Sequence, residues 1–130
     1  MDFSEIYINM CDKAKEIQFA HLVFEAGDFY YEGQDFVTHK PQFSVTSESD
    51  NGKDRTISSM KAWLPRQDQL QLMIGDYKEQ CSVLSRYLLT ECLMPDPIIN
   101  SMEQLILIII MRDKYAKVWN GIDWVKSRSN

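Results

Sequence analysis

The sequence has few of the residues that metal or cofactor chemistry needs. Its 130 residues include only two histidines, three cysteines and five glycines, with no CxxC or HxxxH spacing. A metal site needs clustered His, Cys or carboxylate ligands, and a phosphate-binding loop needs several glycines at the start of a helix. The sequence therefore predicts no metal, no cofactor and no catalytic residue, and we expect a protein that is not an enzyme.

Signals for secretion, disulfides and membrane insertion are also missing. Cys11, Cys81 and Cys92 are odd in number and are not spaced as in a disulfide framework. Residues 1–5 contain neither the basic nor the apolar stretch of a secretion signal. The strongest apolar run, residues 105–111, is much shorter than the roughly twenty residues of a membrane span. We expect a cytoplasmic protein with no membrane contact.

Length and composition favour a single α+β domain over residues 1–130, because 45% hydrophobic and 25% charged residues are typical of globular proteins. Apolar residues at helical spacing predict an N-terminal helix and three later helices, whereas a stretch rich in glycine and aromatic residues predicts a small antiparallel β part. The expected order is helix 1–21, acidic β part 22–60, helical part 61–117, hairpin 118–126 and loose tail 127–130.

Local patterns predict details of the helices. Residues 4–20 are expected to form one helix, with Asp2 and Glu5 as its capping box. Ser101 or Asn100 is expected to cap the helix that contains the apolar run. Two groups of residues are expected in the core: Ile106, Ile109 and Ile110 in that helix, and the stripe of Tyr77, Cys81, Leu84 and Leu88 in the helix before it.

Other patterns predict turns and strands. Residues 29–31 and 36–38 are expected to pair across a short turn at Gly33, and Asp50-Asn51-Gly52-Lys53 is expected to be a second turn. Thr56-Ile57 would follow that turn as a returning strand. Pro65 is expected in the first turn of a helix, where its missing N–H costs nothing.

The net charge of −5 comes from one segment. Residues 22–54 hold seven acidic and two basic residues, and the remaining acidic and basic residues balance. Nucleic-acid-binding domains usually carry a basic face, so direct nucleic-acid binding is not the leading expectation. The segment is either a solubilising face or a surface for a basic partner, such as a nucleic-acid-binding host protein. The candidate partner-binding residues are Asp28, Glu32, Asp35, Glu48, Asp50 and Asp54.

Trp63, Arg66 and Gln67 form a second candidate recognition surface, because Trp and Arg are frequent interface anchors. The alternative is that residues 63–71 are simply the start of a helix. The C-terminal end is slightly basic and contains Trp119 and Trp124. Its tryptophans are suited either to cross-strand packing or to stacking on nucleic-acid bases.

Two segments carry a resemblance: residues 63–70 (WLPRQDQL) and residues 101–124 (SMEQL…KYAKVWNGIDW). They resemble small proteins encoded by phages, prophages and plasmids of Gram-positive bacteria. The resemblance implies a mobile-element accessory protein in a bacterial host cell, and it carries no catalytic residue. By analogy with small acidic phage proteins, we expect an inhibitor that binds a host defence factor, as anti-CRISPR proteins do. The alternatives are a nucleic-acid-associated accessory factor, a phage structural component and a small enzyme.

Overall fold

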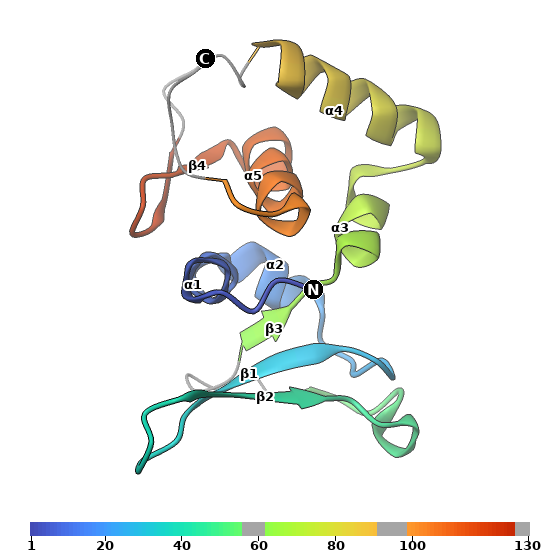
Figure 1. Cartoon of the computed structure of the whole chain (residues 1–130). Helices are drawn as coiled ribbons and strands as arrows, with labels where there is room; N and C mark the ends of the chain where they lie inside the picture. The colour runs from blue at the N-terminus through green and yellow to red at the C-terminus, as the bar shows by residue number, and fades with distance from the viewer. Residues whose placement is uncertain (56–61, 91–98, 127–130) are drawn as a thin grey trace. The chain divides into compact units, whose positions relative to one another are not determined.

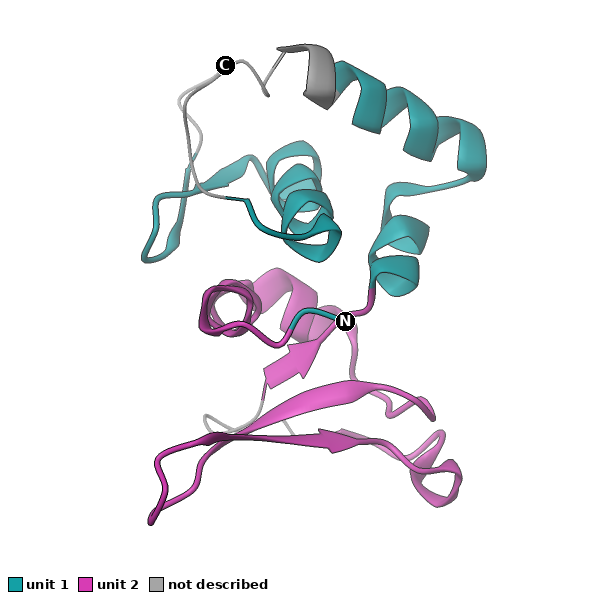
Figure 2. Ribbon diagram, in the orientation of Figure 1, with its two compact units in different colours: residues 1–2, 67–130 teal, residues 3–66 magenta. Residues whose placement is uncertain are grey.

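The computed structural model describes residues 1–55, 62–90 and 99–126. Five α-helices and two small antiparallel sheets lie within these ranges, which confirms the α+β class. The contacts within the chain group it into two compact units (Figure 2). Unit 1 contains residues 1–2 and 67–130, and unit 2 contains residues 3–66.

Unit 2 combines two short helices with a three-stranded sheet. The helices are α1 (Glu5–Lys13) and α2 (Lys15–Ala20), and the strands are β1 (Phe29–Gln34), β2 (Pro41–Val45) and β3 (Ala62–Leu64). Strand β1 is central and pairs antiparallel with both neighbours, in the order β2-β1-β3. Helix α1 packs against β3, so one side of the sheet carries the helices (Figure 1).

The N-terminal helix is broken, which differs from the single helix expected over residues 4–20. Ala14 leaves the helical conformation, with φ −82° and ψ 73°. Its N–H still donates to the carbonyls of Met10 and Cys11, so the chain resumes directly as α2. Met10, Ala14 and Ile17 are buried as their spacing predicts, whereas Ile6 is exposed. The chain changes direction at Ala14, but the row of buried apolar residues continues from α1 into α2.

Helix α1 is capped by Ser4 and not by Asp2. The Ser4 side chain accepts a hydrogen bond from the Tyr7 N–H at 3.2 Å. Asp2 belongs to unit 1, where its Oδ2 accepts hydrogen bonds from the Ser101 hydroxyl and the Gln104 amide. The expected capping box is therefore wrong, because Asp2 is engaged by residues about a hundred positions further along the chain.

The first hairpin is longer than its sequence pattern indicates. Residues 32–34 continue β1, and the turn occupies residues 35–40. Residues 36–38, expected as the returning strand, therefore lie in the turn. The pairing with β2 shifts register between Tyr31 and Gly33, and Gly33 has φ +99°. Gly33 therefore lies in a β-bulge and not in the hairpin turn. Glycine fits either place, because both features need a residue that tolerates positive φ.

The second predicted turn is present in the chain after β2. A short 3₁₀ helix, η1 (Glu48–Asp50), is followed by a turn at Asn51-Gly52, where Gly52 has φ +84°. Val23 and Asp54 then form an isolated antiparallel bridge. The expected strand at Thr56-Ile57 lies outside the described residues.

Unit 1 contains the three predicted C-terminal helices and the terminal hairpin. The elements are α3 (Gln67–Ile74), α4 (Tyr77–Thr90), α5 (Met102–Tyr115), β4 (Lys117–Trp119) and β5 (Trp124–Lys126). Helix α5 packs against α3 and the hairpin follows it closely (Figure 1). Ser101 caps α5 by accepting the Gln104 N–H, and Ile106, Ile109 and Ile110 are at most 1% exposed. Both observations confirm the predictions for this helix.

Two predictions in the helical part are wrong. Pro65 precedes α3 by two residues, and its carbonyl accepts the Tyr7 hydroxyl at 2.6 Å within unit 2. In α4, Tyr77 is 78% exposed and Cys81 is exposed, so their stripe does not face a core. The side chain of Leu88 lies outside the described part of the chain, as does Cys92. Helical spacing identified α4 correctly, but it could not show whether another element covers that face.

Candidate protein-binding surface

An open groove of about 640 Å³ lies in unit 2 between α1, the end of β1 and the turn that follows it. Among the described residues, its lining includes four carboxylates and no lysine or arginine. We call it the acidic groove, defined by Glu5, Asp12, Glu32 and Asp35. Carboxylates from two helical turns and one strand end therefore converge on one hollow, although they are far apart in sequence.

Aromatic side chains form the apolar part of the acidic groove. Phe3, Tyr31 and Phe36 line it. Phe3 is held against the sheet by Phe29 and Phe43, with ring centroids 5.3 and 4.8 Å away. Carboxylates beside aromatic faces suit the cationic side chains of Lys and Arg, which pair with the former and pack over the latter.

The four carboxylates differ in how far they are already engaged. Within the described chain, Glu5 makes no hydrogen bond or ion pair, and Asp12 makes only a 3.9 Å contact with Lys15. Glu32 is the extra residue of the β-bulge and accepts the Ser44 hydroxyl. Glu32 lines a second hollow of unit 2 as well as this groove. Glu5 and Asp12 are thus the most available charges.

Asp35 organises the turn of residues 35–40, which we call the tip loop. Its Oδ2 accepts hydrogen bonds from the Thr38 N–H at 2.8 Å, the Thr38 hydroxyl at 3.0 Å and the Val37 N–H at 3.1 Å. The hydrogen bonds from Thr38, followed by the one from Val37, hold the pKa of Asp35 below its ordinary value. The backbone N–H of Asp35 also donates to the Lys40 carbonyl at 2.9 Å, closing the loop.

The tip loop exposes two adjacent apolar side chains. Phe36 is 97% exposed and Val37 is 85% exposed. The loop extends beyond the paired ends of β1 and β2 (Figure 1). Contiguous apolar side chains on a protruding loop are typical of binding surfaces, because nothing in the fold itself gains from exposing them.

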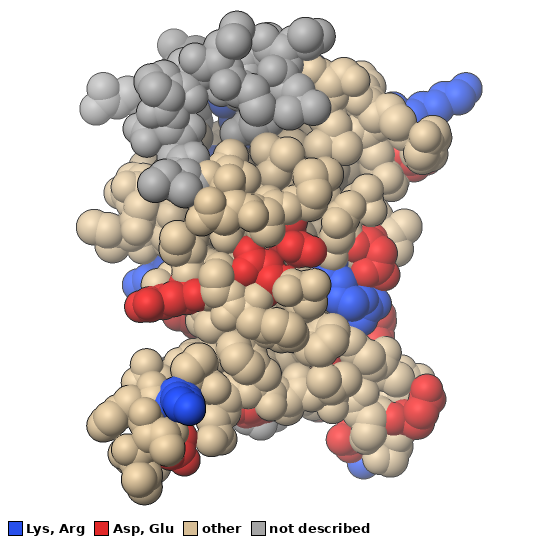
Figure 3. Space-filling model, viewed as in Figure 1, with Lys and Arg blue, Asp and Glu red and all other residues tan. Residues whose placement is uncertain are grey.

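The six acidic residues predicted as a partner surface do not form one group. Glu32 and Asp35 lie in the acidic groove, whereas Glu48 and Asp50 lie in η1 and Asp54 lies in the bridge that follows. On the face shown in Figure 3, acidic side chains form separate groups with basic side chains among them. The groove gains Glu5 and Asp12 from α1, which the charge count alone did not single out.

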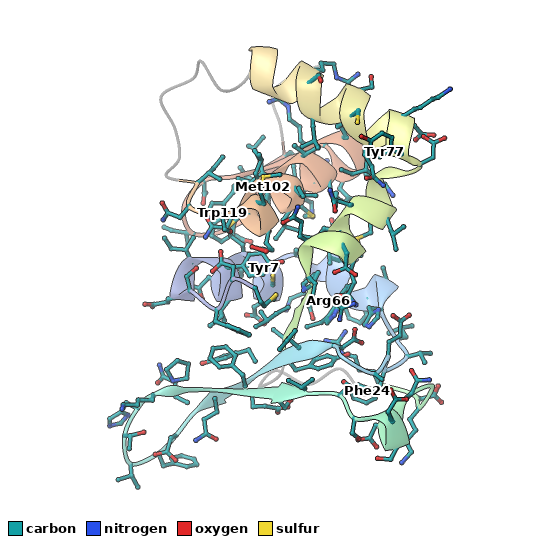
Figure 4. All side chains as sticks on the ribbon, turned by 45° about the vertical axis from the view of Figure 1, so that its right-hand side comes forward. Tyr7, Phe24, Arg66, Tyr77, Met102 and Trp119 are labelled. Carbon is teal, nitrogen blue, oxygen red and sulfur yellow. The ribbon has the colours of Figure 1, made fainter. Side chains whose placement is uncertain are left out.

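A second hollow of about 390 Å³ in unit 2 is lined by Glu32, Asp50 and Asp54, together with Arg55 and the aromatic ring of Phe24 (Figure 4). Burial of the Arg55 guanidinium lowers its pKa from the ordinary value. Arg55 still offsets part of the acidic charge here. This hollow is therefore less selective for a cation than the acidic groove.

Asp28 is buried, so its predicted role in partner binding is wrong. It is 0% exposed, and its Oδ2 pairs with His21 Nε2 at 2.6 Å and accepts the Glu25 N–H at 3.0 Å. The ring of His21 stacks on Trp63, with centroids 3.8 Å apart and planes 9° apart. Asp28 therefore stabilises the region where the chain enters β1, instead of contributing charge to the surface.

Gln18 and Arg55 complete a buried polar network that the sequence did not reveal. The Gln18 side chain donates to the Trp63 carbonyl and accepts the Trp63 N–H, both at 2.8 Å, which ties α2 to β3. Arg55 Nη2 donates to Gln18 Oε1 at 2.7 Å, and its guanidinium lies 5.0 Å from the Tyr30 ring centroid. Burial, above all, raises the pKa of the Tyr30 hydroxyl. The side chains of Gln18 and Arg55 thus find hydrogen-bond partners that are distant in sequence.

The second predicted recognition surface is not supported by its geometry. Trp63 lies in β3 and is 1% exposed. Arg66 is half-buried and donates from Nη1 to the Gly27 carbonyl at 2.7 Å (Figure 4). Gln67 begins α3 in unit 1. Trp63 cannot anchor a partner, and Arg66 is engaged in holding the turn before β1.

The tryptophans of the terminal hairpin pack on each other. Trp119 and Trp124 face each other across β4 and β5, with ring centroids 5.2 Å apart. Trp124 is only 6% exposed. Cross-strand packing is thus the role that the geometry gives to this pair.

Searches for known sites and relatives returned little. Among the described residues, no group of three or more His, Cys, Asp or Glu could hold a metal ion. No helix in the same ranges is both long and apolar enough to cross a membrane. No protein-family model, curated protein or solved structure matches the chain. The acidic groove and the tip loop are therefore the features of the molecule that point to a function.

Proposed function

We propose that this protein acts by binding a basic surface of another protein, and that it is not an enzyme. The observation that carries the proposal is the acidic groove, which presents four carboxylates and aromatic walls without a lysine or arginine among its described lining residues. A lysine or arginine side chain would find both charge pairing and apolar contact there.

The net charge of −5 assists this function from a distance. Opposite charges attract two proteins before contact and raise their association rate, and physiological salt screens this attraction over about 8 Å. At contact, the groove carboxylates act at short range beside the rings of Phe3 and Tyr31. The general charge therefore governs encounter, and the groove governs where the partner docks.

A nucleic-acid-binding host protein is the partner class that fits best. Such a protein must present lysine and arginine side chains to phosphates, so an acidic protein can compete for the same surface. The resemblance to phage and plasmid proteins supports an inhibitor of a host defence factor, in the manner of anti-CRISPR proteins. The burial of Trp63 and the packing of Trp119 on Trp124 disfavour base stacking as the alternative.

Binding of a short labelled peptide of lysine and arginine tests the proposal. We expect the triple variant Glu5→Gln/Asp12→Asn/Glu32→Gln to weaken binding by about tenfold at low salt, because the groove loses three of its four carboxylates. Asp35 is left intact because it organises the tip loop. The measurement is fluorescence anisotropy at low and high salt.

The matched control changes three exposed carboxylates of unit 2 outside the groove, in the variant Glu25→Gln/Glu48→Gln/Asp54→Asn. This control changes the net charge by the same amount as the groove variant. A smaller loss of peptide affinity in the control would therefore assign the binding to the groove. Equal losses for the two variants would show that only total charge matters. Undiminished binding by the groove variant would contradict the proposal.

A further inference from the structure

We propose that Phe36 and Val37 are an apolar anchor that inserts into an apolar pocket of a partner protein, at a place bordered by lysine or arginine. This inference rests on the proposed function and names the kind of partner surface more closely. It starts from the exposure of the two side chains, 97% and 85%, the highest values among the large exposed hydrophobic residues of the described chain. Burying both would remove a large apolar area from water.

The tip loop is already shaped for such a contact. Three donors from Val37 and Thr38 converge on Asp35 Oδ2, and the His39 N–H donates to the Asp35 carbonyl at 3.0 Å. His39 adopts φ +59°, which turns the chain back toward β2. A loop fixed in this way loses little conformational freedom on binding, so more of the contact energy appears as affinity.

The neighbourhood of Phe36 specifies the rim of the partner's pocket. Phe36 also lines the acidic groove, together with Glu32 and Asp35. A partner that buries Phe36 therefore brings its adjacent surface next to those carboxylates. Covering these negative charges with an acidic or uncharged rim would be unfavourable, whereas lysine or arginine on the rim would offset them. A protruding pair fits a concave protein pocket better than a flat surface.

Selection from a display library of a folded scaffold with randomised surface residues tests this inference. The full chain is the bait, so the binders choose their own contact surface. We expect most binders to lose at least about tenfold in affinity for the variant Phe36→Ser/Val37→Ser. We also expect their randomised positions to be enriched in both apolar residues and Lys or Arg. Because both side chains are exposed, the variant should keep the wild-type unfolding midpoint.

Leu72→Ser/Ile122→Ser is the matched control, since these apolar side chains are 75% and 77% exposed elsewhere. Binders unaffected by Phe36→Ser/Val37→Ser, or affected equally by the control, would overturn the inference. It would also be overturned if wild-type chains self-associate through the tip loop in sedimentation, or if the loop binds phosphatidylcholine vesicles.

The same selection separates this inference from the proposed function. Binders rich in Lys and Arg that ignore Phe36→Ser/Val37→Ser would leave the acidic groove as the binding site and remove the anchor. Binders that depend on Phe36 and Val37, yet lack Lys and Arg and show no salt dependence, would keep an apolar anchor while removing both the basic partner and the basic rim.

Discussion

The two ends of β1 hold aspartates that differ in their exposure to solvent. Asp28, just before the strand, is 0% exposed and pairs with His21, whereas Asp35, just after it, organises an exposed loop. Both were expected to present charge to a partner. In the structure both carboxylates accept hydrogen bonds from the chain's own groups. Acidic composition alone thus does not distinguish a docking charge from a structural acceptor.

The largest effect on stability is expected at Asp28, the buried aspartate before β1. Asp28→Ala should lower the free energy of unfolding by about 3 kcal/mol, because it removes a buried carboxylate and leaves the part-buried hydrogen-bonding groups of His21 and the Glu25 N–H without their acceptor. Urea unfolding followed by circular dichroism measures this change. Asp28→Asn keeps a hydrogen-bond acceptor and should cost less. A loss below about 0.5 kcal/mol would place Asp28 among ordinary surface residues and remove the contrast.

A local effect on the tip loop is expected at Asp35, the aspartate after β1. Asp35→Ala should release the tip loop, because the Val37 and Thr38 N–H groups lose their common acceptor. Hydrogen exchange at those two amides should accelerate by at least about tenfold while the unfolding midpoint changes little. Thr38→Val is the companion variant, since it keeps the Thr38 N–H and removes the hydroxyl that donates to Asp35 and accepts the Lys40 N–H. Unchanged exchange in Asp35→Ala would show that the loop does not depend on this carboxylate.

The smallest effect concerns pH. The pKa of Asp35 is lower in the folded protein than in the unfolded chain, so its stabilisation is complete above the unfolded value, about 3.9, and is lost as pH falls through the folded value. The Thr38 amide resonance should therefore keep its native shift until the pH is below about 3.9. An NMR titration measures the midpoint, and a midpoint above that pH would reverse the expected sign.

The sequence predicted the elements whose signals are local. Ser101 and the apolar run that follows it identified α5, and the turn residues Asn120-Gly121 lie in the connection of the terminal hairpin, which spans residues 120–123. A cap, a helical repeat and a turn signal each act within a few positions, so they can be recognised directly in the sequence. The position of the hairpin turn at 35–40 was less predictable, because Phe36 and Val37 favour strands wherever they occur.

Most of the candidate site depends on distant contacts and could not be predicted. The groove combines Glu5 from α1 with Glu32 from a bulge in β1, and no local pattern places these residues together. Asp28 is buried beside His21, whose ring stacks on Trp63, and Trp63 is bonded to Gln18, 45 positions away in sequence. The apolar stripe of α4 shows the converse, since its spacing is helical but Tyr77 remains exposed.

The bulge at Gly33 gives the tip loop a measure of independence from the rest of unit 2. Residues 29–31 pair with both β2 and β3, while the pairs beyond the bulge involve, within the described residues, β2 alone. Changes of loop length can be absorbed beyond the register shift without turning the inward side chains of β1 outward. The loop can therefore vary in sequence and length while the sheet keeps its register. A protein built this way can follow a changing target by altering a few residues.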